Sequence, residues 1–290
     1  MSRRGVVLFG AMCVIWGLPY LMIRVAVREL APVTLVFLRT ALGALILIPV
    51  AGLRGELRPL LLKWKPLLAY TAVEVAIPWV LLARAETKLS SSLTGLLIAA
   101  VPLVGAAIVT LTGDREQLGA RRWLGLLIGI AGVAALVGLD VGQVDALAVA
   151  GIGLVAVGYA VGPIILSRSM TDLPTFGVVA ASLCLTAFAY LPFALLRWPA
   201  EVPSSHVIES VLGLAVICTA LAFVVFFALI AEVGPVRATV ITYINPAVAA
   251  VLGVTLLSEH LTRGMVIGFA LVLAGSVLAA GRRADSVPEP

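Results

Sequence analysis

The second half of this 290-residue chain repeats the first half at a nearly constant offset. Pro246 lies 144 positions after Pro102, and Glu259 lies 143 positions after Glu116. Other pairs keep the same spacing: Pro19 and Pro163, Arg24 and Arg168. Offsets that agree within one residue across most of a chain indicate an internal duplication. Whatever unit the first half folds into, the second half therefore builds again.

The repeated unit consists of apolar runs with few charges. Hydrophobic residues make up 62% of the chain and charged residues only 12%. A helix needs about 20 apolar residues to cross a bilayer. Ten such runs are predicted to do so: 5–27, 33–50, 66–83, 90–112, 123–139, 148–167, 174–196, 207–230, 236–257 and 264–281. We therefore predict an all-α integral membrane protein with ten transmembrane helices.

The ten runs divide the chain into two five-helix units. Residues 1–139 form an N-terminal repeat, 140–147 an extracytoplasmic linker, 148–281 a C-terminal repeat and 282–290 a cytoplasmic tail. Because five is an odd number, the second repeat must enter the membrane from the opposite side. Inverted repeats are typical of secondary transporters, which hold the substrate in a central cavity between the halves.

The distribution of basic residues predicts the orientation. With the N-terminus in the cytoplasm, thirteen arginine and lysine residues fall in inner segments and six in outer ones. The positive-inside rule then places both termini in the cytoplasm, and we expect a multi-pass protein of a bacterial-type inner membrane. The first run is expected to stay in the protein, because it is long and lacks an Ala-x-Ala exit.

Several classes of function are disfavoured by the residues present. The net charge of +5 is spread between apolar runs rather than along a stripe, which argues against nucleic acid as a partner. The chain has no Gly-x4-Gly-Lys-Ser/Thr loop for ATP. The histidines lie at run ends and the cysteines lack metal-site spacing: His206, His260, Cys13, Cys184 and Cys218. We expect no enzyme activity, no cofactor and no metal.

Short motifs at repeated positions carry a family resemblance. Trp16-Gly17-x-Pro19 lies in the first run and Leu38-Arg39 in the second. A hairpin signature occurs twice: Pro102, Glu116, Gly125 and Gly132, then Pro246, Glu259, Gly268 and Gly275. The chain resembles the ten-helix EamA-type branch of the drug/metabolite transporter superfamily, and within it the YddG-type amino-acid exporters. The resemblance implies alternating access around a central cavity, with amino acids, other metabolites or toxic compounds moved mostly outward.

Two charged residues lie inside the apolar runs. Glu74 is mid-way along the third run, where an ionised group costs roughly 3 kcal/mol or more, and we take it as the deepest carboxylate of the chain. Arg39 lies at comparable depth in the second run. Tyr70 precedes Glu74 by one turn and shares its face. Two interpretations stay open: a proton or substrate-ammonium site at Glu74, or a structural Arg39–Glu74 ion pair.

Aromatic and hydroxyl side chains recur at helical spacing in several runs. They could stack on a substrate or meet its polar groups, or they could pack only against neighbouring helices and lipid. The further substrate-binding candidates are Trp16, Tyr20, Tyr159, Phe223, Phe227, Thr242, Tyr243 and Asn245.

Proline and glycine mark further positions. Pro102 and Pro246 interrupt helix hydrogen bonding at matched places, so we predict a hinge at each, with the helix broken there. Glu116 and Glu259 lie near helix ends and are expected to be structural, as caps or loop contacts. Gly125-x3-Gly129 and Gly264-x3-Gly268 predict close helix packing, within one protomer or between two.

Together these observations predict a secondary transporter. It would export amino acids, aromatic and other neutral ones with broad specificity, or related small metabolites by alternating access. The alternative is efflux of drugs or lipophilic cations, which an acidic and aromatic cavity would also suit. A coupled proton, and a monomer or homodimer in the lipid bilayer, complete the hypothesis.

Overall fold

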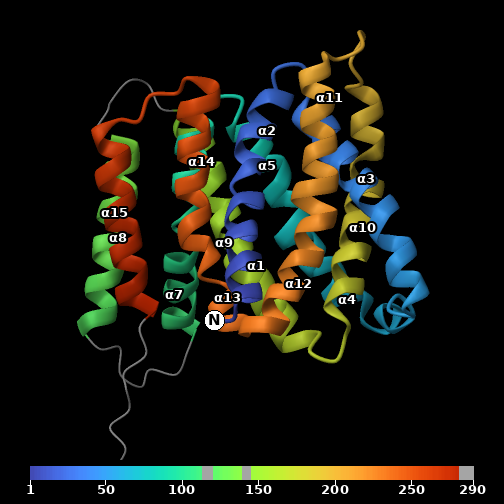
Figure 1. Cartoon of the computed structure of the whole chain (residues 1–290), viewed down its shortest axis with the longest axis horizontal. Coiled ribbons are helices and arrows are strands. Elements are labelled where there is room, and N and C mark those ends of the chain that lie inside the picture. The colour runs from blue at the N-terminus through green and yellow to red at the C-terminus, as the bar shows by residue number, and fades with distance from the viewer. Residues whose placement is uncertain (113–119, 139–144, 281–290) are drawn as a thin grey trace, which may run out of the picture.

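The computed structural model describes residues 1–112, 120–138 and 145–280, and every regular element in these ranges is helical. Glu116, most of the predicted linker and the predicted tail lie outside the described residues. Figure 1 shows the helices running side by side. The elements are α1 (Arg3–Ile15), α2 (Leu18–Ala26), α3 (Pro32–Leu53), η1 (Arg58–Lys63), α4 (Trp64–Tyr70), η2 (Thr71–Ala76), α5 (Ile77–Ala85), α6 (Ser91–Ile98), α7 (Val101–Thr112), α8 (Ala120–Gly138), α9 (Ala146–Ser169), α10 (Thr175–Leu196), α11 (Ser205–Leu212), η3 (Gly213–Leu221), α12 (Ala222–Val233), α13 (Pro235–Ala238), α14 (Ile241–Leu257) and α15 (Arg263–Ala280).

These elements assemble into the ten predicted membrane-crossing stretches. Eight helical stretches are long and apolar enough to span a bilayer by length and composition. The last two are shorter apolar helices, Ile241–Leu257 and Arg263–Ala279, and α13 lengthens the first of them at its N-terminal end. The all-α fold with ten membrane helices is thereby confirmed.

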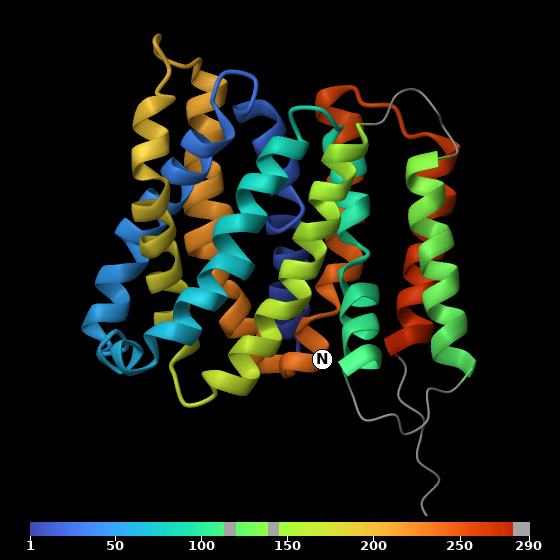
Figure 2. The same cartoon turned by 180° about the vertical axis from the view of Figure 1, so that it is seen from behind.

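The packing of α8 against α15 demonstrates that the repeats are inverted. The two helices occupy the same place in their repeats, and they lie side by side at one edge of the molecule (Figure 1, Figure 2). A Cβ atom on Gly125 would lie 2.5 Å from the Ala279 nitrogen, and one on Gly132 would lie 2.6 Å from the Val272 nitrogen. Residue numbers therefore rise along α8 while they fall along α15, so equivalent helices are antiparallel.

The same contact explains the small-residue spacing. A Cβ atom on Gly268 would lie 2.7 Å from the Gly132 carbonyl oxygen, and one on Gly275 would lie 2.5 Å from the Gly129 nitrogen. Side chains of any size would separate the two backbones, so glycine is required at this crossing. The predicted close packing is therefore found within one protomer.

The largest buried cluster draws on both halves of the chain. Leu35 of α3, Leu183 of α10 and Leu214 of η3 are each exposed by 1% or less. A Cβ atom on Gly43 of α3 would lie 3.3 Å from the Leu183 side chain, which reports how closely α3 and α10 approach. The two repeats are thus packed into each other rather than joined as separate domains.

Breaks in the spanning helices fall at three places, and one of them differs from the prediction. The chain leaves regular helix at Trp16-Gly17, between α1 and α2, and at 99–100, directly before Pro102 in α7. The expected break at Pro246 was wrong, because α14 continues through that residue and the break lies at 239–240.

The neighbouring residue accounts for the continuity at Pro246. Proline cannot donate a backbone hydrogen bond, which frees the carbonyl of Thr242 four residues earlier. With its amide nitrogen turned toward the helix, the Asn245 side chain donates to the Thr242 and Ile241 oxygens at 3.3 Å each. The freed carbonyl is therefore satisfied locally, and the helix does not need to break.

The third and eighth spanning stretches each contain a π-helical segment at matched positions. The segment η2 covers Thr71–Ala76, and an offset of 144 residues places it inside η3, Gly213–Leu221. In η3 the Thr219 hydroxyl donates to the Leu214 carbonyl at 2.8 Å. π-Helical segments inside α-helices are frequent at functional sites, so these two segments indicate where to look for one.

The two ends of α10 provide a test of the predicted orientation. Asp172 precedes this helix and Glu201 follows it, both are exposed, and Figure 1 places the ends of α10 at opposite faces. We expect a cysteine replacing Glu201 to react with an impermeant maleimide on intact cells, and a cysteine replacing Asp172 only after permeabilisation. The background lacks the native Cys13, Cys184 and Cys218. Labelling of the two positions in the reverse order would place the N-terminus outside.

Candidate functional site

Arg39 of α3 is held in the interior by an indole ring and a hydroxyl. Its guanidinium carbon lies 3.7 Å from the centre of the Trp79 ring, and its Nε donates to the Thr219 hydroxyl at 3.0 Å. Arg39 is only 7% exposed. Arginine suits this environment because its flat, weakly hydrated cation can stack on an aromatic face.

The predicted alternative of an Arg39–Glu74 ion pair is not found. The salt bridges among the described residues lie elsewhere and are exposed or half-buried. The bond to Thr219 is the only side-chain hydrogen bond of Arg39 in the described part of the chain. A guanidinium has five N–H donors, so the terminal nitrogens stay free to meet an anionic group.

Glu74 lies on the π-helical segment η2 and faces α9. A Cβ atom added to Gly162 of α9 would overlap the Glu74 carboxylate, so this glycine makes room for it. The Glu74 Oε2 atom is buried and has no hydrogen-bond partner among the described residues. The residue as a whole is half-buried. Glu74 thus presents a carboxylate whose partner is not supplied by the surrounding protein.

Two tyrosines interact electrostatically with these charged side chains. Tyr159 of α9 interacts electrostatically with both Glu74 and Arg39, and its hydroxyl lies beside Trp79. Tyr20 of α2 interacts with Tyr159 and with Arg39. The cluster therefore combines side chains from both repeats: Tyr20, Arg39, Glu74 and Trp79 from the first, Tyr159 and Thr219 from the second. We call these six residues the polar cluster.

The predicted aromatic face packs mainly on itself. Trp16 lies 4.7 Å from Phe226, centre to centre, and Phe223 stacks on Phe227 at 6.3 Å. Phe223 is one turn beyond Thr219, so this group adjoins the polar cluster. The rings contact one another, as expected if they serve mainly in helix packing. They also lie near Arg39, because Thr219 accepts its hydrogen bond.

The remaining predicted site residues are Tyr70 and three residues of α14. Tyr70 is buried in an apolar cluster with Leu67 and Met170, and it also interacts electrostatically with Glu74. Thr242 donates to the Thr239 carbonyl at 2.8 Å, and Tyr243 is half-buried. Asn245 faces the break between α1 and α2, where a Cβ on Gly17 would lie 3.1 Å from the Asn245 carbonyl oxygen. Thr242 and Tyr243 follow the break at 239–240, and Asn245 lies at the break between α1 and α2. These α14 residues therefore border helix breaks.

Glu259 caps a helix of the other repeat. Its carboxylate accepts hydrogen bonds from the Ser91 and Ser92 backbone nitrogens at 2.8 and 2.9 Å, and from their hydroxyls at 3.1 and 2.6 Å. A carboxylate at the N-terminus of α6 satisfies unpaired amides and opposes the helix dipole. The hairpin before α15 is thereby joined to the first repeat.

Further polar contacts join the repeats near the ends of the spanning stretches. Glu29 accepts from the Ser204 hydroxyl at 2.6 Å and nitrogen at 2.7 Å, and these bonds lower the pKa of Glu29. Lys63 donates to Asp172, which lowers the pKa of that carboxyl. The first contact lies at the α11 end of the molecule and the second at the opposite end.

Glu86, not Glu74, is the most deeply buried carboxylate that the structure describes. It is 0% exposed, and neither carboxylate oxygen has a hydrogen-bond partner among the described residues. The sequence analysis missed it because it follows the third apolar run, between Arg84 and Lys88, where a solvated loop is expected.

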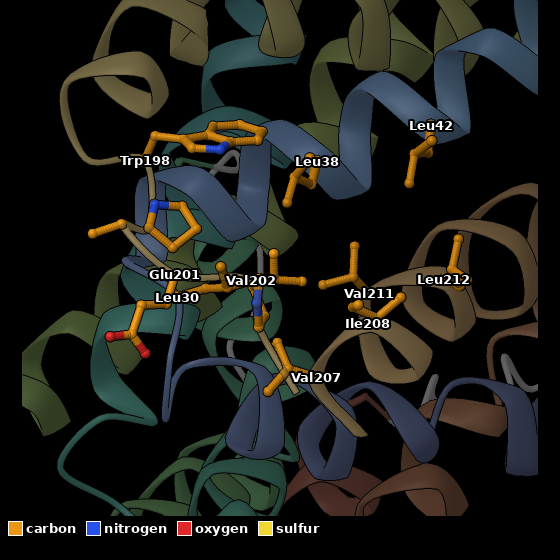
Figure 3. A pocket seen from close by; sticks show the side chains of 13 residues that line it. Leu30, Leu38, Leu42, Trp198, Glu201, Val202, Val207, Ile208, Val211 and Leu212 are labelled. Atoms are coloured by element: carbon orange, nitrogen blue, oxygen red, sulfur yellow. The ribbon is translucent and has the colours of Figure 1, made fainter. Parts of the chain in front are cut away.

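An apolar pocket of about 570 Å³ lies away from the polar cluster. Figure 3 shows Leu38 and Leu42 of α3 on one wall and Ile208 and Val211 of α11 on another. Glu201 is the one charged residue in its lining. The pocket therefore offers an apolar surface near one end of the helices, and none of its lining residues belongs to the polar cluster.

Comparison with known proteins gives consistent matches to membrane transporters. The EamA-like transporter family matches twice, at residues 3–138 and 146–281. The chain is 29% identical to a protein of Escherichia coli K12 named "Uncharacterized inner membrane transporter YedA", over 88% of this chain and 85% of that protein. It is 23% identical to "Uncharacterized transporter YvbV" of Bacillus subtilis 168, over 96% and 92%. A crystal structure with 20% identity has the same fold, with a TM-score of 0.65 over 97% of each chain.

Proposed function

Because this chain belongs to the EamA-like transporter family of the drug/metabolite transporters, we propose that it exports neutral amino acids across the inner membrane by alternating access. Relatives named as inner membrane transporters support the location. Aromatic and other neutral amino acids with broad specificity, or closely related zwitterionic metabolites, are the proposed substrates. The substrate site is the polar cluster.

The observation that carries this proposal is a carboxyl group and a guanidinium group that are not paired with each other. Arg39 is engaged by Trp79 and Thr219, and Glu74 has no partner among the described residues. A free amino acid carries an ammonium and a carboxylate on one carbon. Glu74 would bind the ammonium and Arg39 the carboxylate, each through a charge-assisted hydrogen bond.

The surroundings of the two charges suit the rest of such a substrate. Tyr159 interacts electrostatically with both Glu74 and Arg39, so we expect the substrate to bind beside this tyrosine. Phe223 and Phe227 are half-buried one and two turns beyond Thr219. They offer an apolar surface to an aromatic side chain without enclosing it, which accounts for the proposed broad specificity.

The second candidate function is efflux of lipophilic cations, which Glu74 and the aromatic rings favour. Arg39 disfavours it, since a fixed cation that interacts with Tyr159 repels a second cation bound near that tyrosine. Counterflow of labelled phenylalanine and of labelled tetraphenylphosphonium in proteoliposomes separates the two. We expect exchange of phenylalanine; exchange of the phosphonium alone would replace the proposal with the second candidate.

Arg39 supplies a sharper form of this test. In Arg39→Gln the substrate carboxylate loses a charge-assisted bond, worth about 1.5–3 kcal/mol. We therefore expect phenylalanine counterflow to fall by about tenfold to a hundredfold. The exposed Arg28 provides the matched control, and Arg28→Gln should transport as the unaltered protein does. Full phenylalanine counterflow by Arg39→Gln would show that Arg39 does not bind the carboxylate.

A further inference from the structure

Glu86 is a buried carboxyl group that the proposed substrate site does not use. It follows α5, between the spanning stretches that end at Ala85 and begin at Ser91. Its side chain is 0% exposed, and both oxygens are buried without a hydrogen-bond partner among the described residues. Buried carboxylates are ordinarily paired or hydrogen-bonded, so this group requires an explanation.

Three other titratable or charged groups face Glu86. Arg24 of α2 donates to the backbone oxygen of Glu86 rather than to its carboxylate. Glu259 interacts with Glu86 electrostatically while its own oxygens are engaged by Ser91 and Ser92. Tyr20 of α2 also interacts with Glu86. No donor among them reaches the carboxylate, and the second carboxylate repels it.

These surroundings favour the neutral form of Glu86. Burial raises the pKa of its carboxyl, the nearby Arg24 opposes that rise, and Glu259 adds to it. An ionised carboxylate here would be desolvated and close to another negative charge. The burial of Glu86 and the neighbouring Glu259 therefore both favour a protonated carboxyl group over an ionised one.

The groups around Glu86 belong to both repeats. Glu259 comes from the second repeat, whereas Arg24, Ser91 and Ser92 come from the first. Alternating access requires the repeats to separate at one face at a time. Separation at this face would break the contact between Glu259 and α6, and water would then reach Glu86.

We propose that Glu86 is a proton-binding site that keeps this face of the transporter closed. In the closed form the carboxyl is protonated. On opening, its O–H bond breaks, the proton passes to water, and Arg24 moves from the backbone oxygen of Glu86 onto the carboxylate. This inference rests on the alternating access of the proposed function, and not on the identity of the substrate.

The direction of the pH effect follows from proton counting. The closed form binds one more proton than the open form at pH values above the ordinary pKa of a carboxyl group and below the raised pKa of Glu86 in the closed form. Acid therefore favours closure and alkali favours opening, by up to about tenfold in the equilibrium per pH unit. Tyr20 also interacts with Arg39 and Tyr159, which places the polar cluster within electrostatic reach of this switch.

The test measures the opening directly and needs no substrate. Spin labels replace Thr87 and His260, which are exposed at this face on the first and second repeats, in a chain without the native cysteines. We expect the distance distribution to lengthen as the pH of the reconstituted protein is raised. In Glu86→Gln, which copies the neutral carboxyl, the short distance should persist at every pH.

Matched variants decide the assignment. Glu209 carries an exposed carboxylate on α11, and Glu209→Gln should keep the pH-dependent lengthening. A pH-dependent change that survives in Glu86→Gln would overturn the proposal, as would an absence of any pH-dependent change in the unaltered protein. If phenylalanine is not transported while the distance still responds to pH through Glu86, only the substrate assignment fails.

Discussion

Glu74→Gln is expected to lower phenylalanine counterflow by about tenfold to a hundredfold, the effect of losing one charge-assisted hydrogen bond. Glutamine keeps the size of the side chain but removes the charge that would bind the ammonium. Glu74 Oε2 has no hydrogen-bond partner among the described residues, so the substitution breaks no hydrogen bond of that atom. A neutral amide also costs less to bury than a carboxylate, and thermal stability should not fall.

The control for Glu74→Gln is a carboxylate outside the spanning stretches. Glu209 is exposed, and Glu209→Gln should leave counterflow within the error of the unaltered protein. Both variants are compared at equal amounts of reconstituted protein, after melting curves have been recorded. Undiminished phenylalanine counterflow by Glu74→Gln would remove Glu74 from the substrate site and leave the family membership intact.

The membrane helices could be predicted from the sequence because lipid imposes a simple demand. A spanning segment must be apolar over its whole length and must satisfy its own backbone, so run length and charge spacing suffice. The duplicated hairpin motif then gave the repeat, and the odd number of spans gave the inversion that Gly132 and Val272 display in the α8–α15 contact.

Helix irregularities followed less simply from the sequence. Pro246 pointed to a break, yet the Asn245 amide meets the freed carbonyl and the helix continues. The π-helical segments carry no proline and no distinctive composition. They take part in long-range contacts such as the hydrogen bond that Arg39 donates to Thr219 of η3, which joins residues 180 positions apart. Only the folded arrangement reveals such a contact.

For the charged residues too, the sequence predicts some features and only the fold reveals the others. Glu74 and Arg39 could be identified in the sequence because charges are rare inside apolar runs. Their separate environments could not be predicted, because Trp79 beside Arg39 and Gly162 beside Glu74 are ordinary residues for a membrane helix. Glu86 lies among charged neighbours in the sequence, yet it is fully buried in the folded protein. Sequence position therefore identifies intramembrane charges better than buried charges at helix ends.

Gly162→Ala tests the geometry of the proposed substrate site without touching a charge. A Cβ atom at Gly162 would overlap the Glu74 carboxylate, so the carboxylate must move to admit it. Alanine is a better helix former than glycine by up to about 1 kcal/mol, so α9 itself should not be weakened. We expect phenylalanine counterflow to fall about tenfold, since small displacements of a binding group are costly.

The matched control lies on the same helix. A Cβ atom at Gly153 would meet no atom within 4 Å, so Gly153→Ala changes helix propensity alone and should transport normally. Residues that act through one contact are not additive, so Gly162→Ala combined with Glu74→Gln should be little worse than Glu74→Gln alone. Normal counterflow by Gly162→Ala would mean that the Glu74 carboxylate does not need the position it occupies against α9. A fully additive double variant would mean that Gly162 acts on transport by a route other than Glu74.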